Sequence, residues 1–298
     1  MIVTSIKKLR DPFILLENGI YYAYGTGVGP DNSWDSTRWV CYKNASGSLE
    51  GEWTKIDDSY VIYPEDAIKN RWAPEVHKYN GAFYMIASYF SSKTEHRGCS
   101  IFKAPSPEGP FEEITNGHIT ESNWDCIDGT LYVDKNGQPW MVFVHEWTST
   151  DDKIGRMAVA KLSADLTHFV SEPVELFRAD DPEWTDHCVT DGCFLYDSAD
   201  GGLIMIWSNF DNTHNYCVGI AKSENGKVDG KWVQQSELLF SKEQTGDIYD
   251  GGHGMILRDV DGTEYLCLHS PNHPLGEREE TPILIPIKEK NGTLVCEF

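Results

Sequence analysis

One hairpin pattern recurs five times along the chain, and this repetition constrains the fold more than any other feature. Each copy is a short strand, a turn with glycine and an aromatic-rich strand that ends in polar residues. The turn glycines are separated by 62, 56, 65 and 60 residues, and they are Gly19, Gly81, Gly137, Gly202 and Gly262. Asn-Gly and Asp-Gly pairs permit the positive φ values that tight hairpins need. Internal repetition of this kind indicates an array of similar units.

Two further strands are predicted after each hairpin. The third strands cover residues 39–42, 99–102, 157–160 and 217–221, and the fourth strands include residues 51–54, 109–112, 168–170 and 230–233. A four-stranded sheet cannot bury both faces alone, whereas five sheets arranged around an axis bury them and leave only short edges. We therefore predict an all-β fold, a single five-bladed β-propeller over residues 1–298 with four antiparallel strands per blade. A two-domain β-sandwich is the alternative, but it does not explain the even spacing.

The charge of the chain excludes several classes of partner. The 298 residues include 25 Lys and Arg against 47 Asp and Glu, a formal net charge of −22. Such an acidic surface repels phosphate backbones and anionic lipid, so we expect neither nucleic acid nor a membrane as partner. The N-terminus shows no apolar signal region, and the 8 cysteines form no CxxC pair. We therefore expect free thiols in a reducing compartment and a cytoplasmic protein.

Polar residues stand where a propeller would bring them together. The first strand of each blade runs beside the central channel and the second returns antiparallel. The starts of first strands and the ends of second strands therefore lie at one end of the channel, called the mouth below. The starts carry Asp11, Glu75, Asp128, Asp191 and His253, and the ends carry Thr26, Ser88, Glu146, Asn209 and His269. Turn chemistry explains any one of them, but charge beside a core is costly, so the grouping indicates a functional site.

Carboxylates grouped beside aromatic residues indicate sugar hydrolysis. One carboxylate activates a water molecule while a protonated one donates to the leaving oxygen. A third acid nearby raises the pKa of the donor by like-charge repulsion. The tryptophans that could pack against sugar faces are Trp34, Trp72, Trp124, Trp147 and Trp184. Packing between blades is the alternative for each of them.

Five short motifs carry a resemblance that covers nearly the whole chain. They are Arg10-Asp11-Pro12, Arg71-Trp72-Ala73-Pro74-Glu75, Cys126-Ile127-Asp128-Gly129, Thr190-Asp191-Gly192 and Gly251-Gly252-His253-Gly254. In this order and spacing they are similar to glycoside hydrolase family 43. The resemblance implies a five-bladed propeller and inverting hydrolysis that requires no cofactor. It also implies release of terminal α-L-arabinofuranosyl or β-D-xylosyl units from plant-type oligosaccharides, which are the expected partners.

The resemblance assigns catalytic roles by position. Asp11 resembles the general base, and Asp128 resembles the acid that tunes pKa values and orients the substrate. The general acid of the family is a Glu, usually in Glu-Gly-Pro, where this chain has Asp191-Gly192-Cys193. Since Asp191 is shorter by one methylene, the proton donor stays open: it is Asp191 itself or Glu146 from the neighbouring blade, and Glu183 and Glu75 rank behind these two.

The remaining candidates bind substrate or a metal ion. Trp34, Trp72, Glu75 and His269 are expected to bind substrate because they belong to the predicted mouth. Arg278 resembles an arginine that reaches substrate from the last blade, and a solvated salt bridge is its alternative.

His253 resembles a channel histidine that contacts a structural calcium ion or ordered water. A non-catalytic propeller that binds glycans or protein partners is the alternative function, because a fold does not by itself imply activity.

Overall fold

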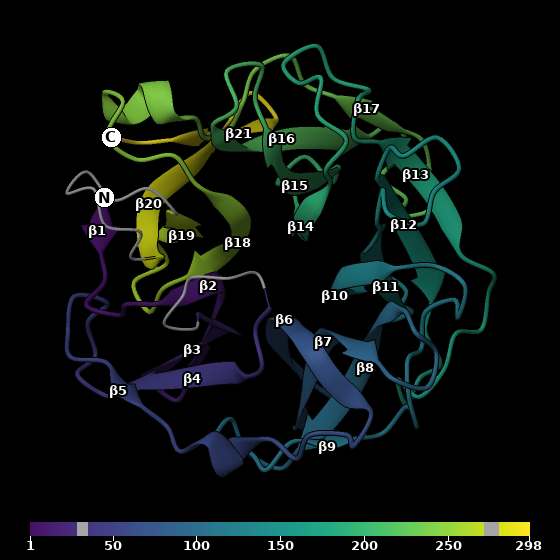
Figure 1. Ribbon diagram of the computed structural model, residues 1–298. Helices are drawn as coiled ribbons and strands as arrows, with labels where there is room; N and C mark the ends of the chain where they lie inside the picture. The colour runs from purple at the N-terminus through teal and green to yellow at the C-terminus, as the bar shows by residue number, and fades with distance from the viewer. Residues whose placement is uncertain (29–34, 271–279) are drawn as a thin grey trace.

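A computed structural model of the protein describes residues 1–28, 35–270 and 280–298. Five separate antiparallel sheets are arranged around one axis, with β2, β6, β10, β14 and β18 nearest the centre (Figure 1). Each of these inner strands contacts the inner strands of both neighbouring blades, so the five sheets close into a ring. The predicted five-bladed β-propeller is confirmed.

The first four blades each contain four strands in chain order from the inside outwards. Blade one has β2 (Leu9–Glu17), β3 (Ile20–Gly27), β4 (Trp39–Asn44) and β5 (Thr54–Lys55), and blade two has β6 (Ala67–Tyr79), β7 (Ala82–Ser91), β8 (Arg97–Ala104) and β9 (Glu112–Glu113). Blade three has β10 (Cys126–Val133), β11 (Pro139–His145), β12 (Arg156–Lys161) and β13 (Val174–Arg178), and blade four has β14 (Asp191–Asp197), β15 (Leu203–Phe210), β16 (Tyr216–Ser223) and β17 (Trp232–Gln234). The helices of the described ranges are two 3₁₀ turns, η1 (Asp58–Tyr60) and η2 (Lys242–Thr245), which are far too short to cross a membrane.

Blade five is completed by both ends of the chain, which the sequence analysis did not foresee. Its inner strands are β18 (Gly252–Arg258), β19 (Glu264–Ser270) and β20 (Thr281–Lys290). The outer edge of β20 pairs with β1 (Ile2–Val3) near its start and with β21 (Thr293–Cys296) near its end. Backbone hydrogen bonds between the first residues and the last blade therefore hold the ring closed.

Two local predictions are wrong. The fourth strand of blade three is β13, not residues 168–170, where Phe169 forms only an isolated bridge. The Ser163 side chain accepts hydrogen bonds from the backbone of residues 167 and 168, so the chain turns there and pairs only later. In the blade-four hairpin the glycine with positive φ is Gly201, at 89°, rather than Gly202.

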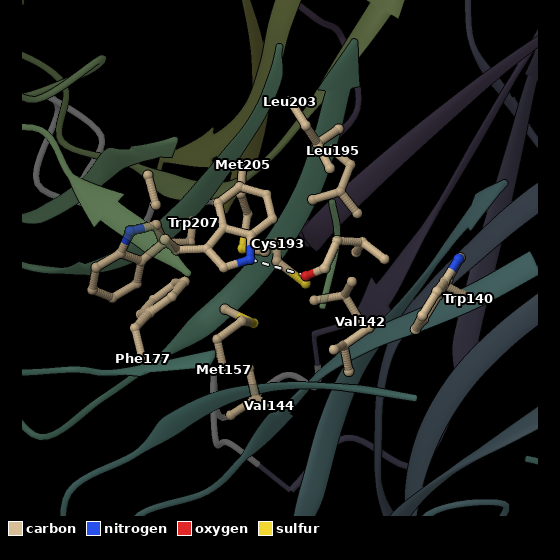
Figure 2. Close-up of a cluster of buried hydrophobic side chains, with 14 of the residues drawn as sticks. Trp140, Val142, Val144, Met157, Phe177, Cys193, Leu195, Leu203, Met205 and Trp207 are labelled. Atoms are coloured by element: carbon tan, nitrogen blue, oxygen red, sulfur yellow. Dashed lines mark hydrogen bonds between the residues drawn. The ribbon is translucent and has the colours of Figure 1, made fainter. Parts of the chain in front are cut away.

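The apolar core of the described residues is divided into five clusters, one at each junction between neighbouring blades. Figure 2 shows the cluster between blades three and four, where Val142 and Val144 of β11 face Leu195 of β14 and Trp207 of β15. Each junction buries the faces of two sheets that neither could bury alone. The mouth ends of the inner strands are thus held by packing on both sides.

Candidate active site

Each inner strand has a bulge at its mouth end, and this bulge aims the site residues. In the register with the second strand, two residues are left unpaired at 11–12, 73–74, 128–129, 192–193 and 253–254. The first residue of every bulge has positive φ, and these residues are Asp11, Ala73, Asp128, Gly192 and His253. A bulge bends its strand and re-aims the extra side chain, which here occurs five times around one channel.

The bulge register separates the five strand starts into three positions. Asp11, Asp128 and His253 occupy the left-handed position. Asp191 pairs with Ser208 directly before its bulge, so it stands one residue nearer the mouth. Glu75 pairs with Ile86 directly after its bulge and lies deeper along the channel.

A cavity of about 420 Å³ opens at the mouth and is lined from all five blades. Its lining residues are Arg10, Asp11, Trp72, Ile127, Asp128, Glu146, Trp147, Val189, Asp191, Phe210, Tyr216, His253 and His269. The four predicted catalytic candidates, together with Trp72, His253 and His269, are therefore brought to one cavity. Its volume lies in the range of small-molecule binding sites.

Asp11 is held as a carboxylate by histidines and a hydroxyl group. Thr26 Oγ1 donates to Asp11 Oδ2 over 2.5 Å, and Oδ1 lies 3.4 Å from His253 Nδ1. The backbone N–H of Asp11 donates to His269 Nδ1 over 3.2 Å. Burial acts to raise the pKa of Asp11, but His253, His269 and Arg10 together with the Thr26 hydrogen bond outweigh it and lower that pKa. Asp11 is therefore charged at neutral pH.

Asp128 shares His253 with Asp11. His253 Nδ1 lies 3.6 Å from Asp128 Oδ2, so the two carboxyl groups face the same nitrogen. The backbone N–H of Gly192 also donates to Asp128 Oδ2, over 3.0 Å. Burial and the charge of Asp11 raise the pKa of Asp128 well above its ordinary range. This geometry couples the inner strands of blades one, three, four and five.

The pKa of Asp191 is shifted in the opposite direction to that of Asp11. The Tyr216 hydroxyl donates to Asp191 Oδ2 over 3.0 Å. Burial and the neighbouring Asp128 raise the pKa of Asp191 to about 8. At neutral pH Asp191 therefore keeps its proton and can give it away.

Gly192 allows the close approach of blades four and five beside this acid. A Cβ atom at Gly192 would lie 2.6 Å from the His253 ring, and the residue has a φ of 23°. A side chain there would displace His253 from both carboxyl groups, so the glycine after Asp191 is required by packing as well as by backbone conformation.

Glu146 is bound to an arginine that the sequence analysis did not select. Arg97, the first residue of β8, donates through Nε to Glu146 Oε2 and through its second amino group to Asp125 Oδ2. The Arg97 guanidinium also lies 5.7 Å from the Trp72 ring centroid. Burial raises the pKa of Glu146, and the ion pair with Arg97 acts against that rise.

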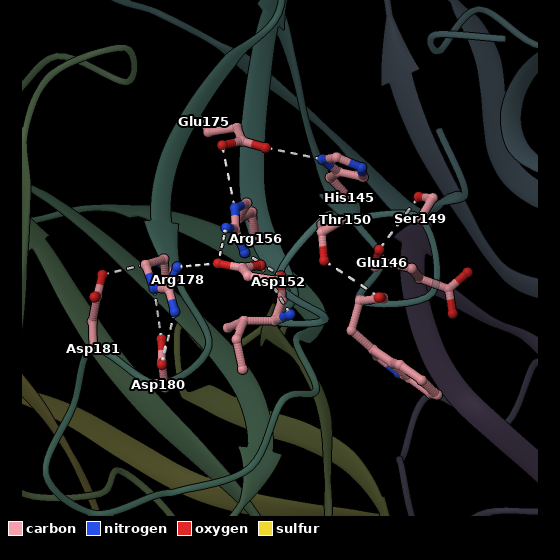
Figure 3. A network of polar contacts seen from close by, with 12 residues as sticks. His145, Glu146, Ser149, Thr150, Asp152, Arg156, Glu175, Arg178, Asp180 and Asp181 are labelled. Atoms are coloured by element: carbon pink, nitrogen blue, oxygen red, sulfur yellow. Dashed lines mark hydrogen bonds and ion pairs between the residues drawn. The ribbon is translucent and has the colours of Figure 1, made fainter. Parts of the chain in front are cut away.

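The loop after β11 carries Glu146 and Trp147 and is fixed to the outer strands. Figure 3 shows His145 paired with Glu175 of β13, whose other oxygen lies 3.3 Å from Arg156 Nε. Asp152 accepts from Arg156 over 2.7 Å. Exposed ion pairs contribute little singly, but this network ties the cavity wall to blade three at both ends.

Several predicted substrate residues do not line the cavity. Glu75 is buried and lies 3.0 Å from His77 Nε2. Trp124 stacks on His145 at 3.9 Å, and Trp184 packs on Trp207 at 5.2 Å, so both serve packing. Trp34 and Arg278 lie outside the described residues.

Two residues of the site, each at the start of a third strand, were not predicted from the sequence. Tyr216 begins β16 and Arg97 begins β8. The third strand starts where the second ends, so its first residue also reaches the mouth. The predicted third strands began at their apolar runs, 99–102 and 217–221, and thereby excluded both residues. Phe210, at the end of β15, was missed for a similar reason.

The calcium ion expected at His253 stays a prediction. Among residues 1–28, 35–270 and 280–298, no group of three or more His, Cys, Asp or Glu side chains is arranged to hold a metal ion. His253 faces the two carboxyl groups.

Comparisons with known proteins identify the family. A model described as glycosyl hydrolases family 43 matches residues 3–294. An extracellular exo-α-(1→5)-L-arabinofuranosidase of Cellvibrio japonicus (strain Ueda107) is 24% identical over 309 residues, covering 88% of this chain and 78% of that protein. An extracellular endo-α-(1→5)-L-arabinanase 1 of Bacillus subtilis (strain 168) is 28% identical over 153 residues, covering 48% of this chain and 45% of that protein.

Solved structures agree with this assignment. An endo-arabinase from Bacteroides thetaiotaomicron VPI-5482 aligns with a TM-score of 0.80 and 34% identity, covering 98% of this chain and 99% of that one. A thermostable family-43 glycoside hydrolase aligns with a TM-score of 0.84 at 22% identity, covering 99% of this chain and 95% of that one, which shows the same fold. The chain therefore belongs to family 43 of the glycosyl hydrolases and is a glycosidase.

Proposed function

We propose that the protein hydrolyses α-1,5-linked L-arabinofuranosyl units with inversion at the anomeric carbon. The observation that carries this proposal is the contrast between two acids in one cavity. Asp11 has a lowered pKa and Asp191 has a pKa of about 8. A charged carboxylate and a protonated donor at the same pH are what two-carboxylate glycoside hydrolysis requires.

The neighbouring charges favour Asp191 over Glu146 as the proton donor. Glu146 is paired with a guanidinium, which stabilises its carboxylate form. Asp191 faces Asp128, and a neighbouring acid stabilises the protonated form. We therefore assign the proton to Asp191 and give Glu146 the role of accepting hydrogen bonds from sugar hydroxyl groups beside Trp72.

In the proposed reaction, Asp11 removes a proton from a water molecule that attacks the anomeric carbon. Asp191 gives its proton to the glycosidic oxygen as the bond to that carbon breaks. Asp128 lies next to His253 and raises the pKa of Asp191, whereas the pKa of Asp11 is lowered. Each turnover moves one proton onto Asp11 and one away from Asp191, and exchange with solvent restores both.

The names of the relatives favour arabinan over xylan. The two curated relatives described above are named for α-1,5-L-arabinan chemistry, and the Bacteroides structure is named an endo-arabinase. The cavity is lined from all five blades, which favours enclosing a terminal unit. We therefore favour release of terminal arabinofuranosyl units over cleavage inside the arabinan chain, and we favour both of these activities over release of β-D-xylosyl units.

The test is turnover of α-1,5-arabino-oligosaccharides, followed by proton NMR of the first product anomer. We expect the inverted β-anomer, arabinose as the main early product, and little release of dye from cross-linked arabinan. The Asp11→Asn variant should lose about 10³-fold or more in kcat, because it cannot accept the proton from water. A retained anomer, or an Asp11→Asn variant with unchanged turnover, would reject the mechanism. Fast release of dye would reject cleavage at chain ends but would leave the mechanism standing. A preference for xylosides would reject arabinan as the substrate.

A further inference from the structure

Tyr216 contacts the proposed proton donor and has no role in the mechanism described so far. It is the first residue of β16, its side chain is buried, and its hydroxyl lies 3.0 Å from Asp191 Oδ2. Asp191 and Tyr216 come from the inner and third strands of the same blade. The contact is thus made where two strands of blade four reach the cavity.

The Tyr216 ring is held on three sides. It packs on Phe210 with ring centroids 5.1 Å apart and on His269 at 5.6 Å. On the third side lies Gly252 of blade five, where a Cβ atom would come within 2.4 Å of the ring. The absence of a side chain at Gly252 gives the ring its place, and the ring in turn fixes the direction of the hydroxyl.

We propose that Tyr216 is a positioning residue that determines which oxygen of Asp191 carries the catalytic proton. This proposal rests on the proposed function, in which Asp191 is the donor. A protonated carboxyl group has one O–H oxygen and one carbonyl-type oxygen. Because the Tyr216 hydroxyl donates to Oδ2, Oδ2 acts as the carbonyl-type oxygen and the proton resides on Oδ1.

The proton balance of the step follows from this arrangement. As the glycosidic bond breaks, its electron pair stays on the leaving oxygen, which takes the proton from Asp191 Oδ1. Asp191 becomes a carboxylate, and Tyr216 keeps its own proton. The hydroxyl of Tyr216 then donates to a charged acceptor, and a hydrogen bond to a charged group is stronger than one to a neutral group. Tyr216 thus stabilises the transition state more than the ground state.

The neighbouring charges define the expected pH effect. Asp191 is influenced by Asp128, His253 and Asp11, and Tyr216 is influenced by Asp191, Asp11 and Asp128. Against burial and Asp128, the Tyr216 hydrogen bond lowers the pKa of Asp191. Removing the hydroxyl should therefore raise the pKa of the donor and shift the high-pH limb of the kcat profile upwards.

The test is the Tyr216→Phe variant, which keeps the ring and removes the hydroxyl. On α-1,5-arabinobiose we expect kcat to fall about 10- to 100-fold, with KM changed less. On a 2,4-dinitrophenyl arabinofuranoside, whose leaving group needs little proton donation, the loss should be slight. The high-pH limb should move up by about one pH unit. Tyr24→Phe is the matched control, because Tyr24 also loses a buried hydroxyl hydrogen bond, 2.6 Å to Pro107 O, outside the cavity.

The Asp191→Asn background separates this proposal from the proposed function. If Tyr216 acts through Asp191, Tyr216→Phe should have no further effect on kcat in Asp191→Asn. An equal loss in both backgrounds, or losses that are the same for both leaving groups, would overturn the positioning role. Full activity of Asp191→Asn on arabinobiose would instead overturn the assignment of the donor, whatever Tyr216→Phe does.

Discussion

Blades one and four each present an aspartate at the mouth end of the inner strand, beside a two-residue bulge. In blade one the aspartate is the left-handed residue of the bulge, and in blade four it precedes that residue. Asp11 thereby meets His253 and His269, whereas Asp191 meets Asp128 and Tyr216. An aspartate is charged in blade one and protonated in blade four because the register shift gives the two carboxyl groups different neighbours.

Glycine makes this difference compatible with close packing. At the left-handed position of blade four stands Gly192, against which the His253 ring lies. A side chain at that position would displace the His253 ring from Asp11 and Asp128. The shift by one residue therefore gives the site an acid that lies near Asp11 but differs from it in protonation.

The sharpest way to test the comparison is to remove the protonated member. Asp191→Asn should lower kcat on α-1,5-arabino-oligosaccharides about 10²- to 10³-fold and leave hydrolysis of a dinitrophenyl arabinofuranoside nearly unchanged, because only the natural leaving group needs the proton. Glu146→Gln is the matched variant, and it should raise KM for both substrates alike. If the leaving-group dependence belonged to Glu146→Gln instead, the two roles would have to be exchanged.

A smaller effect concerns stability. The pKa of Asp191 is about 8 in the folded state and ordinarily 3.8, so the folded state binds more protons between these values. Stability contributed by the protonated group is then lost as pH rises through this window. Asp191→Asn removes this dependence, so it should gain a few kcal/mol relative to wild type between pH 5 and pH 8. Urea unfolding at both pH values measures this gain, and parallel pH curves for the two proteins would refute it.

The repeat spacing in the sequence predicted the fold. Features that are not part of the repeat were not predicted. The five hairpins and their spacing require five similar sheets, and these were found. Closure of the ring by β1 was not predictable from the repeats, because Ile2 and Val3 pair with residues almost a full chain length away. The fourth strand of blade three was misplaced because Phe169 resembles a strand residue but follows a turn fixed by Ser163.

The sequence predicted those site residues whose position follows from the hairpin topology. Asp11, Asp128, Asp191 and Glu146 were selected because strand starts and ends meet at the mouth. Glu75 was grouped with them because of its place in its motif. The bulge at residues 73–74 comes before Glu75, so Glu75 lies deeper in the channel than the other acids. Bulge positions depend on the pairing register, which the residues alone do not state.

Direct titration of the two aspartates tests the central claim most directly. Carboxyl-¹³C NMR of Asp-labelled protein, with signals assigned from Asp11→Asn and Asp191→Asn, follows each group between pH 3 and 10. We expect the Asp11 signal to change below its ordinary value of 3.8, and the Asp191 signal to change near pH 8. Asp191 titrating near its ordinary value of 3.8, as an acid already charged at neutral pH, would contradict the account.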